Sequence, residues 1–92
     1  MPKRVDANQK TIVGSLRALG ATILILSDVG KGCPDILVGW HGVNYLFELK
    51  DGSKCPSHRR LTVHEQKFMD TWKGQVIVIK SVEEAITFVM SQ

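Results

Sequence analysis

The sequence is poor in cysteine and proline: its 92 residues include two cysteines and three prolines. It also has no apolar run long enough to cross a membrane. Cys33 and Cys55 are too few for a disulfide framework, and no Cys or His spacing matches a zinc site. No signal-like segment opens the chain. These absences predict a soluble protein of the cytoplasm, with reduced thiols and without a membrane partner.

The remaining composition is that of a small globular domain. Hydrophobic residues make up 43% of the chain, the net charge is +3 and the pI is about 9.1. A single domain over residues 1–92 has a modest core, which makes self-association attractive. The weak positive charge permits an anionic partner without requiring one.

Hydrophobic periodicity predicts an α/β (α+β) chain with the order α-β-β-β-α-β-α. A capping box over residues 62–65 predicts the start of the second helix. The expected helices cover residues 6–19, about 62–72 and 81 onward, and the expected strands cover 21–27, two arms within 35–50, and 75–79. Phe68, Met69 and Trp72 have a one-sided helical spacing and are expected in the core. Trp40 is expected to be exposed, where it could contact a second subunit.

Residues 32–52 predict a hairpin with charged residues on a strand that otherwise reads as buried. Because side chains alternate along a strand, Leu46, Glu48 and Lys50 share one face and the odd-numbered residues 45–49 share the other. Both faces are largely apolar, and unpaired charge is costly in such surroundings. A surface ion pair between Glu48 and Lys50 is the plainer interpretation, but the apolar flanks favour a functional site.

A two-residue turn at His41-Gly42 would fix the register of this hairpin, so that facing residues have numbers summing to 83. Asp35 then faces Glu48, with Cβ atoms about 5 Å apart on the same face of the sheet. Two carboxylates placed in this way suit a hard divalent cation. A lysine beside them could orient or deprotonate an attacking water, or neutralise developing charge.

These residues also carry a resemblance. Pro34-Asp35, twelve intervening residues and Glu48-Leu49-Lys50 resemble the PD-(D/E)XK nuclease signature. The segments "DANQKTIVGSLRALGA", "GCPDILVG", "FELKDG" and "LTVHEQKFMDTWKG" extend the similarity to stand-alone VRR-NUC domains, virus-type replication-repair nucleases that bacteriophages often encode. The resemblance implies a PD-(D/E)XK restriction-endonuclease-like core, in which a mixed four-stranded sheet is flanked by helices.

The resemblance also implies a catalytic set of Asp35, Glu48 and Lys50. Asp35, Glu48 and the Leu49 backbone carbonyl would bind Mg²⁺ or Mn²⁺. Many related nucleases carry a further glutamate ligand on the first helix, where this chain has Gln9. We expect Gln9 to bind the metal through water or to orient a ligand; the alternative is a polar, solvated start to that helix.

Two other sets of residues are expected around this centre. Gln66 belongs to an "EQ" pair like that of the family and would support Lys50, whereas Glu65 is expected to cap its own helix. A basic loop follows the catalytic strand, and its position there favours contacts with DNA phosphates over a merely solvated loop. The expected DNA-binding residues are Lys31, Lys54, Arg59 and Arg60.

The sequence thus predicts a Mg²⁺- or Mn²⁺-dependent DNA endonuclease that hydrolyses phosphodiester bonds. By the same resemblance we expect selectivity for branched or Holliday-junction DNA and a homodimer that cuts two strands symmetrically. If the chain is phage-encoded, its place is the cytoplasm of the bacterial host. The alternatives are a non-catalytic nucleic-acid-binding module with a nuclease-like fold, and an RNA-processing nuclease.

Overall fold

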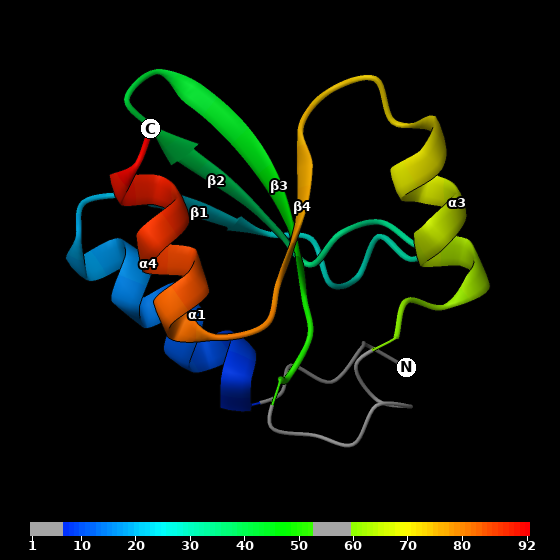
Figure 1. Cartoon of the computed structure of the whole chain (residues 1–92), viewed down its shortest axis with the longest axis horizontal. Coiled ribbons are helices and arrows are strands. Elements are labelled where there is room, and N and C mark those ends of the chain that lie inside the picture. The colour runs from blue at the N-terminus through cyan, green and yellow to red at the C-terminus, as the bar shows by residue number, and fades with distance from the viewer. Residues whose placement is uncertain (1–6, 53–59) are drawn as a thin grey trace.

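The computed structural model describes residues 7–52 and 60–92, and the elements within them follow the predicted order (Figure 1). The fold is α+β, with a four-stranded sheet flanked by helices. In chain order the elements are α1 (Ala7–Ala18), β1 (Thr22–Ile25), β2 (Ile36–Trp40), β3 (Val43–Leu49), α3 (Val63–Thr71), β4 (Val76–Ile79) and α4 (Val82–Met90).

The sheet has the strand order β1-β2-β3-β4 and is mixed. The pairs β1–β2 and β2–β3 are antiparallel, whereas β3–β4 is parallel. A parallel partner requires a crossover, and α3 lies in the connection that carries the chain from β3 to β4. β3 is therefore an inner strand with a neighbour on each side.

The hairpin register agrees with the prediction. Ile36 pairs with Phe47 and Trp40 pairs with Val43, so facing residues have numbers that sum to 83. His41 and Gly42 form the turn with φ values of 50° and 81°. Positive φ at both central residues is the requirement of the turn type whose twist matches the flanking strands. This turn sets which side chains of β2 and β3 face each other.

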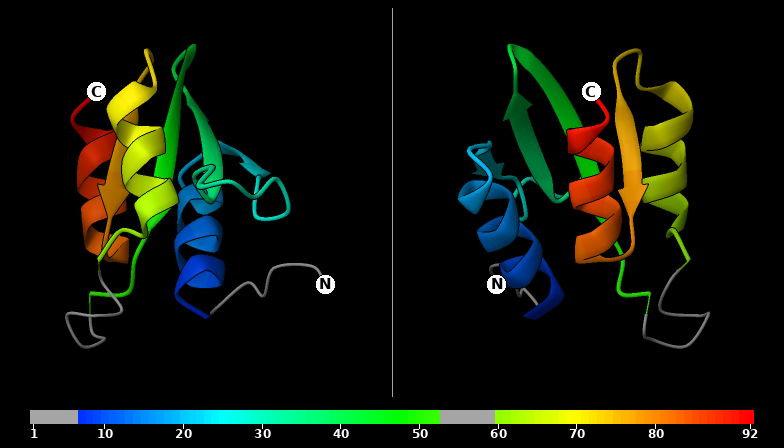
Figure 2. Two further views of the ribbon diagram at one scale, coloured as in Figure 1. Left: turned by 90° about the vertical axis from the view of Figure 1, so that its right-hand side faces the viewer. Right: turned by 60° about the vertical axis from the view of Figure 1, so that its left-hand side comes forward.

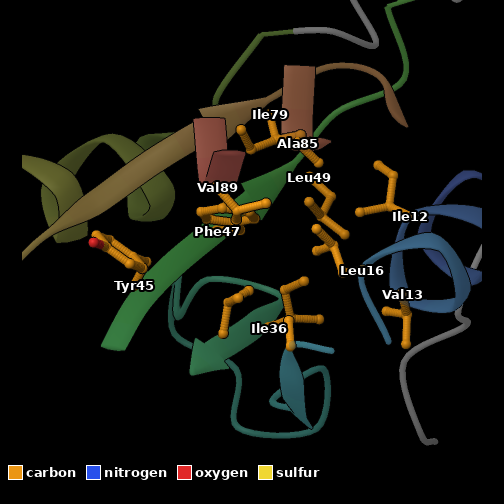
Figure 3. Close-up of a cluster of buried hydrophobic side chains, with 12 residues drawn as sticks. Ile12, Val13, Leu16, Ile36, Tyr45, Phe47, Leu49, Ile79, Ala85 and Val89 are labelled. Atoms are coloured by element: carbon orange, nitrogen blue, oxygen red, sulfur yellow. The ribbon is translucent and has the colours of Figure 1, made fainter. Parts of the chain in front are cut away.

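The hydrophobic core lies between one face of the sheet and the helices α1 and α4 (Figure 3). The odd-numbered residues 45, 47 and 49 of β3 point into it, as the alternation predicts. Phe88 of α4 meets the rings of Tyr45 and Phe47 edge to face. The even-numbered residues of β3, including Glu48, therefore lie on the opposite face.

α3 lies on the other side of β4 from α4 and packs differently (Figure 2). Of its residues only Glu65 is buried, and all of α3 is described by the structure. The prediction that Phe68, Met69 and Trp72 are core residues is wrong: the first two are half-buried, and Trp72 is 47% exposed. Phe68 and Trp72 stack on each other with ring centroids 5.0 Å apart.

Two details complete the fold. The capping box at the start of α3 is confirmed, because the Thr62 side chain accepts from the Glu65 N–H while Glu65 accepts from the Thr62 N–H.

Trp40 is not as exposed as expected, since it packs partly against the core. In the described part of the chain, every helix is too short or too polar to span a bilayer.

Candidate active site

Asp35, just before β2, is held by three hydrogen bonds to the backbone of β3 and of the segment after β1. Its N–H donates to the Phe47 carbonyl at 3.0 Å, and its carbonyl accepts from the Leu26 N–H at 2.8 Å. Its side-chain Oδ2 accepts from the Leu49 N–H, also at 2.8 Å. Because the contact reaches the backbone just after Glu48, it fixes the Asp35 carboxylate beside the strand that carries Glu48 and Lys50.

Glu48 is buried, with 1% of its surface exposed, and neither carboxylate oxygen accepts a hydrogen bond from a described residue. Burial raises the pKa of Glu48 to about 10, and the neighbouring carboxyl groups of Asp35 and then Glu65 add to the rise. Each of these effects disfavours a negative charge. The predicted proximity of Asp35 and Glu48 is therefore present.

Lys50 follows β3 directly, and its ammonium contacts Glu65 rather than Glu48. Lys50 Nζ donates to Glu65 Oε1 at 2.7 Å, and the same oxygen accepts from the Thr62 N–H at 2.8 Å. Burial acts to raise the pKa of Glu65, but the hydrogen bonds from Lys50 and Thr62 outweigh it and lower the pKa to about 2. Glu65 is thus an ionised carboxylate that connects the end of β3 to the first turn of α3.

The "EQ" pair contributes its first member to this site. Gln66 is exposed, and its Nε2 donates to Asp70 Oδ1 on the next turn of α3 at 2.9 Å. The residue in contact with Lys50 is Glu65; the supporting role of Gln66 stays a prediction. The capping box is the signal that points to Glu65, since it holds this side chain at the helix start.

The first turn of α1 approaches the same strand ends. Asn8 Nδ2 donates to the Lys50 carbonyl at 3.2 Å. Gln9 is 5% exposed, and its Nε2 donates to Ser27 Oγ at 3.2 Å. The interpretation of these two residues as a merely solvated helix start does not hold, because both make tertiary hydrogen bonds. The approach of this helix end to the site agrees with the expectation; metal binding through Gln9 stays a prediction.

The loop before Asp35 has an unusual backbone. Gly30, Lys31 and Gly32 have φ values of 78°, 56° and 78°. At Gly32 an added Cβ would overlap the backbone carbonyl of His64, so glycine permits the loop to touch the start of α3. The loop that leads to Asp35 and the turn that carries Glu65 therefore support each other.

The expected DNA-binding residues are only partly described. Lys31 and Arg60 are exposed, as phosphate contacts must be. Lys54 and Arg59 lie outside the described residues. The loop expected to follow DNA phosphates stays a prediction over most of its length.

The donors present suit a divalent cation. In residues 7–52 and 60–92, no group of three or more His, Cys, Asp or Glu side chains has the arrangement of a metal site. Two carboxylates and a backbone carbonyl are nevertheless the hard oxygen donors from which Mg²⁺ is usually held, with water and substrate completing the shell. The two oxygens of Glu48 that lack a donor are the atoms a cation would satisfy.

Comparisons with protein-family models, curated proteins and solved structures found no match for this chain.

Proposed function

We propose that this protein is a metal-dependent DNA endonuclease with a PD-(D/E)XK-type core like that of VRR-NUC domains. The observation that carries the proposal is the state of Glu48: a fully buried carboxyl group beside Asp35, with no hydrogen-bond donor among the described residues. Buried polar groups normally have partners, and an unsatisfied one is costly. A cation bound between Asp35 and Glu48 would supply the missing contact and allow Glu48 to ionise beside Asp35.

The residues of the proposed centre have separate tasks. Asp35, Glu48 and the Leu49 carbonyl would hold Mg²⁺ or Mn²⁺, and Gln9 would orient a ligand or a water. When bound, such an ion polarises a scissile phosphate and lowers the pKa of a bound water. Lys50 would position the attacking water or stabilise charge that develops on the phosphate. Its contact with Glu65 supports this role by restricting where the ammonium can lie.

The proposed substrate is DNA, contacted through its phosphates by Lys31 and Arg60 and by Lys54 and Arg59. Branched DNA and a homodimer follow from the family resemblance and from the small size of the chain, which covers little DNA alone. A bacterial cytoplasm is the setting that a phage-encoded protein of this kind would have.

The first experiment compares cleavage of a labelled four-way junction, a linear duplex and a single strand with Mg²⁺ or Mn²⁺. Wild-type protein should cut in a metal-dependent manner, and Glu48→Ala and Lys50→Ala should each lose at least about a hundredfold in rate. Asp70→Ala, which removes an exposed carboxylate of α3, is the matched control and should cut normally. Paired symmetric cuts in the junction, together with a dimer mass in sedimentation, would support a homodimer that cuts branched DNA.

A non-catalytic nucleic-acid-binding module is the second candidate. The finding that favours it is the lack of a three-ligand acidic group among the described residues. DNA binding that persists with chelator, without metal-dependent cleavage of any of the three substrates, would establish this function. Metal-dependent cleavage of RNA in preference to DNA, in direct competition, would instead identify an RNA-processing nuclease.

A further inference from the structure

A groove of about 250 Å³ runs between α1 and β1. Five of its lining residues belong to α1, and four of them follow the spacing i, i+3, i+4, i+7, which places those four in one stripe along the helix. The groove is lined by Gln9, Lys10, Val13, Gly14, Arg17 and Ile25.

The charge in this groove has one sign. Lys10 and Arg17 are both exposed and stand at the two ends of the stripe. They are seven positions apart on the helix, a rise of roughly 10 Å, which is about three nucleotide steps of one DNA strand along the duplex axis. No carboxylate is among the described residues that line the groove. Its two cations are therefore spaced for an extended polyanion rather than for a single small anion.

The middle of the groove is open because of Gly14. This residue lies inside a helix, where glycine costs stability relative to alanine. A Cβ built at Gly14 meets no atom within 4 Å, so close packing does not require glycine here. What the missing side chain provides is space on the outer surface of α1 between Lys10 and Arg17.

Hydrogen bonds connect one end of the groove to the segments of the candidate active site. Gln9, which lines the groove, donates to Ser27, and the neighbouring Leu26 N–H donates to the Asp35 carbonyl. The preceding residue of α1, Asn8, donates to the Lys50 carbonyl. The end of the groove at Gln9 is therefore connected by hydrogen bonds to the segments that carry Asp35 and Lys50.

We propose that this groove binds the sugar–phosphate backbone of the DNA strand next to the cleavage site, with Lys10 and Arg17 each contacting a phosphate. The proposal rests on the proposed nuclease function, and the hydrogen bonds of Asn8 and Gln9 connect this groove to its site. The described lining contains no aromatic side chain for base stacking, so the contact is with the backbone and is independent of sequence. Gly14 is the position at which the strand comes closest to the helix.

The test is the salt dependence of DNA binding, measured by fluorescence anisotropy of a labelled duplex in chelator, so that no cleavage occurs. Lys10→Ala and Arg17→Ala should each weaken binding about fivefold to tenfold at roughly 0.1 M salt, and each should flatten the slope of log K against log salt by about 0.9. Lys73→Ala removes an equal charge from an exposed position after α3 and should leave both quantities nearly unchanged.

Gly14→Leu tests the space without changing charge. Leucine favours helix more than glycine, so the melting temperature should stay the same or rise, while DNA binding weakens about tenfold or more. Binding that is unchanged in Gly14→Leu and in the Lys10→Ala/Arg17→Ala double variant would overturn the groove proposal. If wild-type protein still showed metal-dependent cleavage in a parallel assay, the proposed nuclease function would stand while the groove proposal failed. The two failures are therefore distinguishable.

Discussion

Lys50 and Glu65 illustrate how a single contact decides the chemistry of a residue. Without a partner, the Lys50 ammonium at the end of β3 would be free to pair with Glu48 and Asp35. Its hydrogen bond to Glu65 instead directs the ammonium toward the start of α3. The ion pair thus serves the proposed mechanism, because it restricts where the lysine can lie.

The first prediction at this scale concerns Glu65→Gln. The amide oxygen can still accept from Lys50 and Thr62, but the negative charge that restrains the ammonium is lost. We expect kcat for metal-dependent cleavage to fall about tenfold with little change in KM, because positioning affects the transition state more than substrate binding. Glu65→Ala also removes the capping box and should cost about 1 kcal/mol of unfolding free energy.

Gln66→Ala is the control for this prediction. Gln66 is exposed and bonds to Asp70 on its own helix, so its loss should affect neither kcat nor the unfolding free energy measured in urea. A loss of kcat in Gln66→Ala, with normal activity in Glu65→Gln, would show that Gln66 rather than Glu65 supports Lys50. Normal kcat in both Glu65 variants would show that the Lys50–Glu65 ion pair is a structural contact without a role in cleavage.

Individual residues differ in how far the sequence determines their surroundings. The pairing of Asp35 with Glu48 follows from alternation and from the length of one turn, both of which are local. The pairing of Lys50 with Glu65 depends on where α3 docks, and the two residues lie 15 positions apart on different elements. Local rules therefore predicted the acidic pair and missed the partner of the lysine.

At the scale of elements, the loop before β2 and the start of α3 form one supporting unit, and Gly32→Ala should disrupt it. The new Cβ would overlap the His64 carbonyl, and alanine is strained at a φ of 78°. We expect a loss of about 2 to 4 kcal/mol in unfolding free energy, measured by urea denaturation. Cleavage should fall as well, since Asp35 and Glu65 lie on the two segments that must separate.

Gly30→Ala is a matched control in the same loop. Gly30 has the same φ of 78°, but a Cβ at that position meets no atom within 4 Å. Only the backbone strain remains, which should cost about 1 to 2 kcal/mol. Equal losses in the two variants would show that strain alone acts, and that the contact between this loop and α3 does not hold the site together.

The elements also show what periodicity determines and what it leaves open. The helices and strands begin and end within a few residues of their predicted bounds because caps, glycines and alternating apolar residues are local signals. The one-sided apolar residues of α3 were predicted to be buried, yet Glu65 alone of that helix is. Periodicity identifies an apolar stripe, but the neighbouring elements decide how much of the stripe is covered.

At the scale of the whole molecule, the sheet combines predictable and unpredictable steps. The antiparallel hairpin follows from its turn, but the parallel pairing of β4 with β3 depends on a crossover between strands far apart in sequence. That pairing makes β3 an inner strand and buries Glu48. The resemblance predicted a mixed sheet, whereas single-sequence periodicity gave only the order of its elements.

Burial of Glu48 should couple the stability of the entire domain to pH and to metal. Its pKa is raised from 4.5 to about 10, so the folded metal-free protein keeps the proton while the unfolded chain releases it above about pH 4.5. The contribution of Glu48 to stability is therefore full below that pH and is lost as pH rises through about 10. Glu65 has a pKa lowered to about 2, so its contribution to stability is present above about pH 4.5 and is lost as pH falls toward 2.

Melting temperatures between about pH 5 and pH 9, with chelator or with Mg²⁺ or Mn²⁺, test this coupling. With chelator, wild-type stability should fall with pH, by at most about 1.4 kcal/mol per pH unit for one proton, while Glu48→Gln should have a flatter profile. A bound cation favours the ionised carboxylate, so stabilisation by metal should grow with pH and vanish in Glu48→Gln. A melting temperature indifferent to metal across this range would exclude Asp35 and Glu48 as a metal site, because a ligand that binds the folded state must stabilise it.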